Sequence, residues 1–175
     1  GKPWRISETI DFGHEDLSCP VIIADINGDG RSEIIVGHAH GYGLDWWEPR
    51  ENQNGRTWIK HPIDPFNSQY HDLHWADIDG DGENELITGT RYMAHCGNDP
   101  GAFDDLGICY FKWNGEGFSK QVVVWGPYGQ GKGVGIEFAV TDLRNTGRLD
   151  IIAPGKDGLD ISYNEGTSYL TLRAP

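Results

Sequence analysis

Short apolar runs alternate with turns along almost the whole chain. The runs are rich in Val, Ile, Trp and Tyr, as at residues 21–24, 34–36 and 122–125, and Gly, Asn and Asp separate them. Apolar runs of this length between turn-forming residues predict β-strands. No helical period is sustained anywhere in the sequence. We therefore expect an all-β fold.

One pattern recurs three times, at residues 21–37, 73–89 and 138–155. In each copy an apolar run leads into a polar turn and a second apolar run, and two further strand-like runs follow. Four strands per repeat, arranged radially, form the blade of a β-propeller. We predict a β-propeller segment of three four-stranded antiparallel blades plus an extra N-terminal outer strand. The blades are expected at about residues 20–63, 72–124 and 137–173, and the outer strand at residues 4–10.

Three blades are fewer than the roughly four to eight blades of a closed propeller. The 175 residues are therefore expected to form a single propeller segment rather than a complete ring. We favour a segment of a longer chain, and self-association into a ring is the alternative. No signal peptide begins at Gly1, so we expect a mature or trimmed chain, or a piece of a larger one.

The first two copies carry acidic loops with oxygen-bearing residues at alternate positions. Calcium needs six to eight oxygen ligands, and a tight loop can point alternate side chains inward. An EF-hand is excluded because its closing Glu is replaced by Val36 and Thr88, and the flanks read as strands. The remaining alternative is an acidic turn without a metal. Each loop is predicted to bind one Ca²⁺, through Asp25, Asn27, Asp29, the Arg31 carbonyl and Glu33, and through Asp77, Asp79, Asp81, the Glu83 carbonyl and Glu85.

The third copy departs from this pattern. Arg144 stands where the second side-chain ligand would be, and Thr146 stands where the third would be. We predict no calcium in this loop. The Arg144 guanidinium is expected to pair with Asp142 or Asp150 in place of the metal.

Composition narrows the function further. The chain has 27 acidic and 14 basic residues and a formal net charge of −13, which disfavours nucleic acid as a partner. No apolar run approaches the roughly 20 residues of a membrane span. The three cysteines form no CxxC pair, so a structural zinc site is not supported. A disulfide between Cys96 and Cys109 is left open.

The two acidic loops have the form Dx(D/N)xDGxxE and lead into Ile-Ile-Val-Gly and Leu-Ile-Thr-Gly, and they resemble FG-GAP/VCBS repeats of integrin-type propellers. This resemblance covers nearly the whole chain, strongly in the first two loops and partly in the third. It implies a bladed propeller with calcium in loops on one face. Because ordinary calcium sites fill outside the cytosol, we expect an extracellular or cell-surface location, with the periplasm as an alternative.

A second resemblance involves residues 88–113 and 155–159. These stretches are similar to propellers that act on sugars, namely propeller polysaccharide lyases and the propeller part of aldos-2-ulose dehydratase. Those families use His, Tyr and Arg, sometimes with a metal, on one face. No residue of this chain matches their catalytic residues one to one.

Strand direction places the connections opposite the acidic loops on one common face. These connections are rich in His and Tyr, and the loop at 90–106 is longer than a turn requires. The face is interpreted as a carbohydrate-binding surface, an active site for β-elimination, or a transition-metal site of His38 and His40 with His71, His74 or His95. Candidate catalytic residues are His38, His71, His74, Arg91, Tyr92 and His95, and candidate ligand-binding residues are His14, His40, Tyr42, Tyr128 and Lys132.

The preferred function is a calcium-binding extracellular β-propeller module that recognises carbohydrate through this face. A carbon–oxygen lyase acting on a sugar or uronate polysaccharide is the first alternative. A protein-interaction scaffold without catalysis is the second. No nucleophile elbow, Walker loop or dinucleotide fingerprint is present, so we leave open whether the chain is an enzyme.

Overall fold

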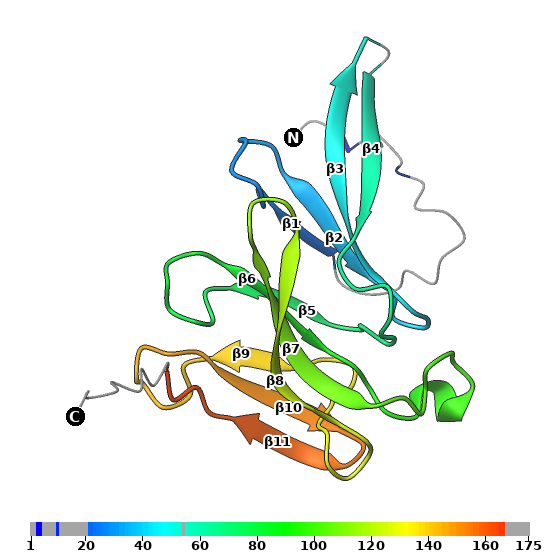
Figure 1. Ribbon diagram of the computed structural model, residues 1–175, viewed down its shortest axis with the longest axis vertical. Helices are drawn as coiled ribbons and strands as arrows, with labels where there is room; N and C mark the ends of the chain where they lie inside the picture. The colour runs from blue at the N-terminus through cyan, green and yellow to red at the C-terminus, as the bar shows by residue number, and fades with distance from the viewer. Residues whose placement is uncertain (1–2, 5–9, 11–20, 54, 167–175) are drawn as a thin grey trace, which may run out of the picture.

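The computed structural model describes residues 3, 4, 10, 21–53 and 55–166. Within these residues the chain forms eleven β-strands and no α-helix, so the predicted all-β class is confirmed (Figure 1). One short 3-10 turn, η1 (Ala94–Gly97), lies in the loop between β6 and β7. None of the described helical segments is long and apolar enough to cross a membrane.

The strands form three antiparallel sheets that follow one another along the chain. The first and second sheets have four strands in sequential order, and the third has three strands within the described residues. The first sheet consists of β1 (Val21–Ala24), β2 (Glu33–Gly37), β3 (Leu44–Asn52) and β4 (Gly55–Pro62). The second consists of β5 (Leu73–Ala76), β6 (Glu85–Gly89), β7 (Leu106–Trp113) and β8 (Phe118–Gly126). The third consists of β9 (Ala139–Thr141), β10 (Asp150–Gly155) and β11 (Gly158–Ser162).

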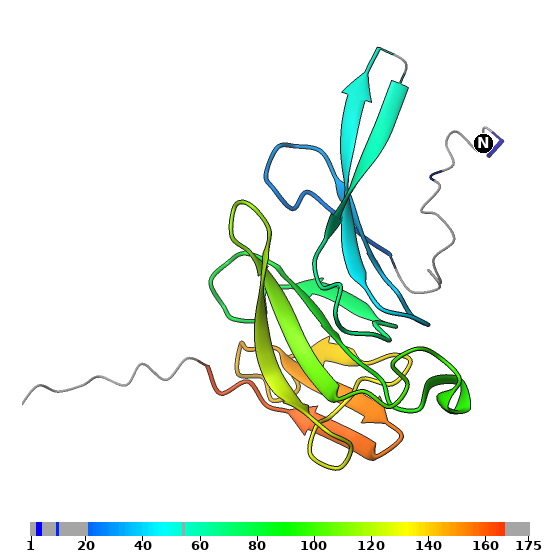
Figure 2. The same cartoon turned by 45° about the vertical axis from the view of Figure 1, so that its right-hand side comes forward.

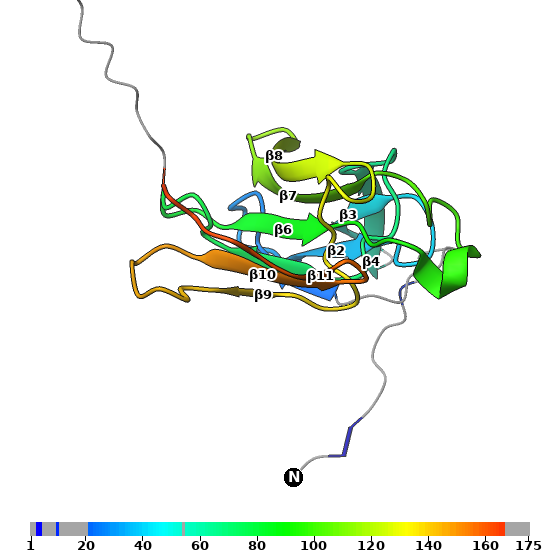
Figure 3. The same cartoon turned by 90° about the horizontal axis from the view of Figure 1, so that it is seen from below.

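The sheets lie in layers, each against the next (Figures 1 and 2). The first strands of the first two sheets, β1 and β5, contact each other. Each sheet has its acidic or Asp-led loop, between its first two strands, at the same end of the molecule. Figure 3 shows this end on the left and η1 at the opposite end on the right. The fold thus separates the acidic loops from the His- and Tyr-rich connections.

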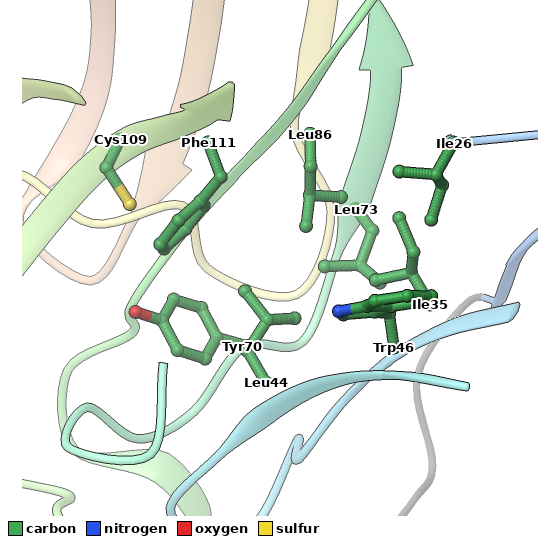
Figure 4. Close-up of a cluster of buried hydrophobic side chains, with 9 residues drawn as sticks. All are labelled: Ile26, Ile35, Leu44, Trp46, Tyr70, Leu73, Leu86, Cys109 and Phe111. Carbon is green, nitrogen blue, oxygen red and sulfur yellow. The ribbon is translucent and has the colours of Figure 1, made fainter. Parts of the chain in front are cut away.

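Two hydrophobic clusters hold the layers together. One lies between the first and second sheets (Figure 4), and the other lies between the second and third sheets. Strand β6 shows how the second sheet contributes to both clusters, because successive side chains of a strand point to opposite faces of the sheet. Leu86 belongs to the first cluster and Ile87 to the second, and both are fully buried.

A polar clamp also joins the second and third sheets. The Asp72 carboxylate accepts the Phe138 backbone N–H at 2.9 Å, and His74 Nε2 lies 3.0 Å from the Phe138 carbonyl oxygen. His74 Nε2 also lies 3.5 Å from Asp72 Oδ2. His74, a candidate catalytic residue from the sequence, therefore has a structural role between two layers.

Three sequence predictions concern residues outside those the structure describes. They are most of the outer strand at residues 4–10, the fourth strand of the third blade after residue 166, and the ligand candidate His14. The number of blades and the closure of a ring also stay predictions. Cys96 and Cys109 are both free, so a disulfide between them is absent. Cys109 is buried in β7, and burial raises the pKa of its thiol to about 12.

Candidate functional site

The two acidic loops share two hydrogen bonds from glycine N–H groups to the leading aspartate, and the first loop adds bonds from the Asp29 N–H to Asp25 and Asn27. In the second loop, the Asp77 carboxylate accepts the backbone N–H groups of Gly80 and Gly82 at 2.7 and 3.0 Å. The first loop repeats both bonds at 2.9 Å, from Gly28 and Gly30 to Asp25. All four glycines have positive φ, between 76° and 95°, a conformation that glycine adopts without steric cost.

The closing glutamates lie below the loops with their side chains turned inward. Glu33 Oε2 accepts the Ile26 N–H at 2.8 Å, and Glu85 Oε2 accepts the Ile78 N–H at 3.0 Å. Both glutamates are fully buried. Burial raises the pKa of each carboxyl group, and the neighbouring aspartates add to the effect. A cation beside them would favour the charged forms.

The second loop passes a structural test for a hard cation. Carboxylate oxygens of Asp77, Asp79 and Glu85 lie within 4.8 Å of one another. Among the described residues, the buried atoms Asp79 Oδ1 and Glu85 Oε1 accept no hydrogen bond. Oxygens that converge and lack donors are the ligands that calcium uses. Asp77, Asp79 and Glu85 are therefore the side chains that would hold the ion, and a ligand role of the Glu83 carbonyl stays a prediction.

Lys112 is a part of the second loop that sequence reasoning missed. Its Nζ lies 2.6 Å from Asp79 Oδ2, 2.5 Å from Asp81 Oδ2 and 3.4 Å from Glu85 Oε1. Hydrogen bonds to Asp79 and Asp81 raise the pKa of Lys112. The residue lies in β7, one position after Phe111, which pairs with Leu86 of β6. Lys112 could have been predicted from the pairing of β6 with β7, because this register places residue 112 beside residue 85.

The third loop is closed by Arg144, as predicted. Arg144 Nη2 lies 3.0 Å from Asp150 Oδ1, and its Nε lies 3.3 Å from Asp150 Oδ2. The guanidinium also donates to the Asn164 carbonyl oxygen and to Glu165. Its carbon lies 4.4 Å from the centre of the Tyr163 ring. The expected ion pair with Asp150 is confirmed.

A pocket of about 700 Å³ lies at the opposite end, between the second and third sheets. The long loop at residues 90–105 and the connection from β8 to β9 form much of its wall. Gly133 and Gly135 allow backbone segments to approach each other closely at the pocket. A Cβ at Gly133 would collide with the Thr90 carbonyl oxygen, and a Cβ at Gly135 would collide with the Pro154 carbonyl oxygen. The polar side chains that line the pocket are Arg91, Tyr92, His95, Glu137, Lys156 and Asp157.

The long loop carries unusual backbone conformations. Met93, His95 and Cys96 have φ of 51°, 43° and 60°. Non-glycine residues in this left-handed region cost free energy and cluster at functional sites. The loop is held by contacts with the segment that connects β2 to β3. In one of them, the Tyr42 hydroxyl donates a hydrogen bond to Asp104 at 2.7 Å. The loop therefore bridges two layers at the pocket rim.

Three of the six histidines that the structure describes lie apart from the histidine cluster at the long loop. His14 is outside the described residues, and His74 forms the clamp described above. His38 is buried and lies 2.8 Å from Asp45. His61 stacks on Trp46, with ring centres 4.2 Å apart. Trp46 is buried in the first cluster.

The remaining histidines gather around Asp99. His40 Nδ1 and His95 Nδ1 each lie 3.0 Å from this carboxylate, and the two rings stack with centres 4.5 Å apart. The His71 ring meets His40 edge-on at 5.8 Å. Arg91 Nη2 lies 3.1 Å from His40 Nδ1 and already provides a positive charge there. A transition metal at this place stays a hypothesis, which the guanidinium disfavours.

The aromatic candidates at the pocket also come together. Tyr92 and Tyr128 stack, with ring centres 4.1 Å apart and planes inclined by 21°. Lys156 Nζ donates to the Met93 carbonyl oxygen at 2.5 Å. Lys132, a ligand candidate, pairs instead with Asp157 and Asp160. The pocket therefore offers the Tyr92 ring, which stacks on Tyr128, together with Arg91 and Lys156 as cations.

Comparison with known proteins agrees with the acidic loops. A family model of the FG-GAP-like repeat matches residues 25–88. Residues 25–88 form an FG-GAP-like repeat. A search of curated proteins found no match to the chain. Together with the three antiparallel sheets, the match identifies a β-propeller-type module.

The FG-GAP-like repeat begins at Asp25 and ends at Thr88, within β6. It therefore contains both acidic loops and the whole of β2, β3, β4 and β5. Lys112 and the pocket of about 700 Å³ lie beyond the matched residues. The resemblance inferred from the sequence is thus confirmed for the repeat, while the similarity to sugar-active propellers stays a prediction.

Proposed function

We propose that this chain is a calcium-binding, extracellular β-propeller module that recognises acidic carbohydrate. The observation that carries the proposal is the pocket opposite the acidic loops, which Arg91, Tyr92 and Lys156 line, with Tyr128 stacked on Tyr92. Sugar rings pack their C–H faces on aromatic rings, and carboxylates bind cationic side chains. A pocket of about 700 Å³ has a volume usual for a bound small molecule.

The charge distribution supports an acidic rather than a neutral sugar. Arg91 is buried, and its Nε and Nη2 donate to the neutral oxygens of Gln69 and Ala39 at 3.1 and 3.2 Å. Burial lowers the pKa of Arg91, and Asp99 opposes this effect only in part. The Lys156 ammonium also donates to a neutral carbonyl. A ligand carboxylate would therefore find Lys156 and Arg91, whose hydrogen bonds go to uncharged oxygens, although Asp99 lies 3.6 Å from Arg91 Nη2.

Calcium has a structural role in this proposal. It would tie the first and second strands of each acidic sheet together and relieve repulsion among the carboxylates. Extracellular calcium fills even weak sites of this kind, which supports a location outside the cytosol.

The binding experiment compares polygalacturonate with its fully methyl-esterified form, which has lost the carboxylate charge. We expect binding of the acidic polymer, with the dissociation constant raised at least tenfold by Lys156→Met or Tyr92→Ala. Arg50→Met is a charge-matched control, because Arg50 is exposed on β3 and pairs with Glu48. Isothermal titration calorimetry provides the constants. Equal affinity for both polymers would contradict the proposed ligand class. So would a loss of affinity in Arg50→Met as large as that in Lys156→Met.

A β-eliminating lyase is a second candidate, which His71 favours. Its Nδ1 lies 3.0 Å from the Ile136 carbonyl oxygen, which can only accept, so Nδ1 carries the proton and Nε2 is the basic nitrogen. Burial lowers the pKa of His71, which keeps it neutral and suited to be a general base. Release of an unsaturated product that absorbs in the ultraviolet would establish the lyase, and loss of this product in His71→Ala would assign the base.

A further inference from the structure

The three Asp-led loops differ in the cation that the protein itself brings to them. In the third loop Arg144 occupies the position of a ligand and holds Asp150 with two hydrogen bonds. In the second loop Lys112 reaches in from β7 and contacts Asp79, Asp81 and Glu85. In the first loop the observed ion pair is between Arg31 and Asp29 at the exposed rim. The cationic side chain thus contacts the closing carboxylate more closely from the first loop to the third.

The registers of the sheets explain this difference between the first two loops. Leu86 pairs with Phe111 in the second sheet, and Ile34 pairs with Trp47 in the first. The residues that follow on the third strands are therefore equivalent, and they are Lys112 and Glu48. Glu48 carries the opposite charge and pairs with Arg50 and His61. The position beside the closing glutamate is thus cationic in one sheet and anionic in the other.

Lys112 does not satisfy the second loop completely. Glu85 Oε1 is fully buried, accepts no hydrogen bond from the described residues, and has Lys112 Nζ at 3.4 Å. Asp79 Oδ1 is also buried without a hydrogen bond. A lysine has three N–H donors, whereas calcium accepts six to eight oxygens. These two oxygens point to a ligand with a larger coordination shell than an ammonium group.

The Lys112 side chain can leave the loop without unfolding the sheet. About a third of its side-chain surface is exposed (34%), and a lysine has a flexible stem that can carry its charge into water. A divalent ion between Asp77, Asp79 and Glu85 would lie a few ångströms from the ammonium and be repelled by it. Calcium and the Lys112 ammonium therefore exclude each other.

We propose that Lys112 is a resident cation of the second loop and competes there with the divalent ion, so that the second loop binds calcium more weakly than the first. The proposal rests on the proposed calcium-binding function and adds an order of filling to it. The first loop fills first, and the second fills only at concentrations at which calcium displaces Lys112.

Titration of single-loop variants tests the proposal. Asp25→Ala leaves the second loop, Asp77→Ala leaves the first, and calorimetry gives the calcium dissociation constant of each. In the Asp25→Ala background, terbium luminescence gives an independent reading of the second loop, because Trp75 and Trp113 line the same pocket as Glu85 and Lys112. The Asp25→Ala change is needed because Asp25 of the first loop lines this pocket too. We expect tighter calcium binding by Asp77→Ala than by Asp25→Ala. In the Asp25→Ala background, Lys112→Met is expected to tighten binding at least tenfold.

Lys60→Met removes the same charge from the first sheet, where Lys60 pairs with Asp45, and is the control. We expect it to change the calcium dissociation constant by less than twofold. Lys112→Gln replaces Lys112→Met if the latter fails to fold, as judged by circular dichroism. Unchanged or weaker binding in the folded Lys112 variant would overturn the competition while leaving calcium in the first loop intact. Absence of calcium binding by every variant would overturn both the competition and the proposed calcium-binding function.

Discussion

At the scale of single residues, the clamp of Asp72 and His74 shows how charge joins two layers. Burial would raise the pKa of Asp72, but His74 and the backbone N–H groups of Phe138 and Leu73 outweigh it and lower the pKa. The hydrogen bond to Asp72 raises the pKa of His74, against a smaller opposing effect of burial. Each group therefore stabilises the folded state in its charged form.

This pair predicts a pH window of stability. The contribution of His74 is complete below the ordinary histidine pKa of about 6.5 and is lost as pH rises through its higher folded value. The contribution of Asp72 is present above about pH 4 and is lost as pH falls through its lower folded value. His74→Gln is thus expected to cost about 1 kcal/mol near pH 5.5, and less at pH 8.5. Urea unfolding at the two pH values measures this, and a cost that does not shrink at high pH would contradict the ion pair.

Residue-scale contacts also define what sequence reasoning could and could not predict. The Gly28 and Gly80 turns and the Arg144–Asp150 pair depend on residues at most six positions apart, so the local pattern is sufficient. Lys112 lies 33 positions from Asp79, and its contact depends on the register of two strand pairings. Asp99, which gathers His40 and His95, lies in a long loop without a periodic pattern. Its contacts depend on how two layers pack.

At the scale of elements, one glycine allows the long loop at residues 90–105 to pack against the neighbouring layer. Gly101 has φ of +72°, and a Cβ there would collide with the Ser68 side chain of the neighbouring layer. Gly115 is a matched comparison, with φ of +97° and nothing within 4 Å of a Cβ.

We expect Gly115→Ala to cost about 1 kcal/mol, from the left-handed backbone alone. Gly101→Ala is expected to cost roughly 1–3 kcal/mol more, because the new methyl group has no space. It should also open the loop to limited proteolysis near residue 95. Denaturant unfolding and protease digestion of both variants measure the two effects. Equal costs would show that the loop does not need its contact with Ser68.

The strands themselves were predictable as elements because they are short, locally bounded and apolar. Strand β4 begins at Gly55, three residues before its first large apolar residue, Trp58. Its exposed positions give no apolar signal for the early start. Pairing with the long β3 extends the strand instead.

At the scale of the whole molecule, calcium is expected to contribute to global stability through the proposed loop sites. Occupation of one site at a hundred times the dissociation constant stabilises the folded state by about 2.7 kcal/mol. A chelator is therefore expected to lower the melting temperature, and added calcium to restore it, as measured by scanning calorimetry. The double variant Asp25→Ala, Asp77→Ala is the control and should be insensitive to both. A wild-type melting curve that the chelator leaves unchanged would contradict both sites.

The second sheet contributes to both hydrophobic clusters, whereas the first and third sheets contribute to one each. The outward faces of the first and third sheets expose Ile23 and Leu159. A fragment that ends between β8 and β9 would keep one cluster whole, and so would a fragment that starts at β5. A cut inside the second sheet would divide both hydrophobic clusters. Dissection of this chain into shorter pieces for expression should therefore keep residues 73–126 intact, whichever neighbouring sheet is removed.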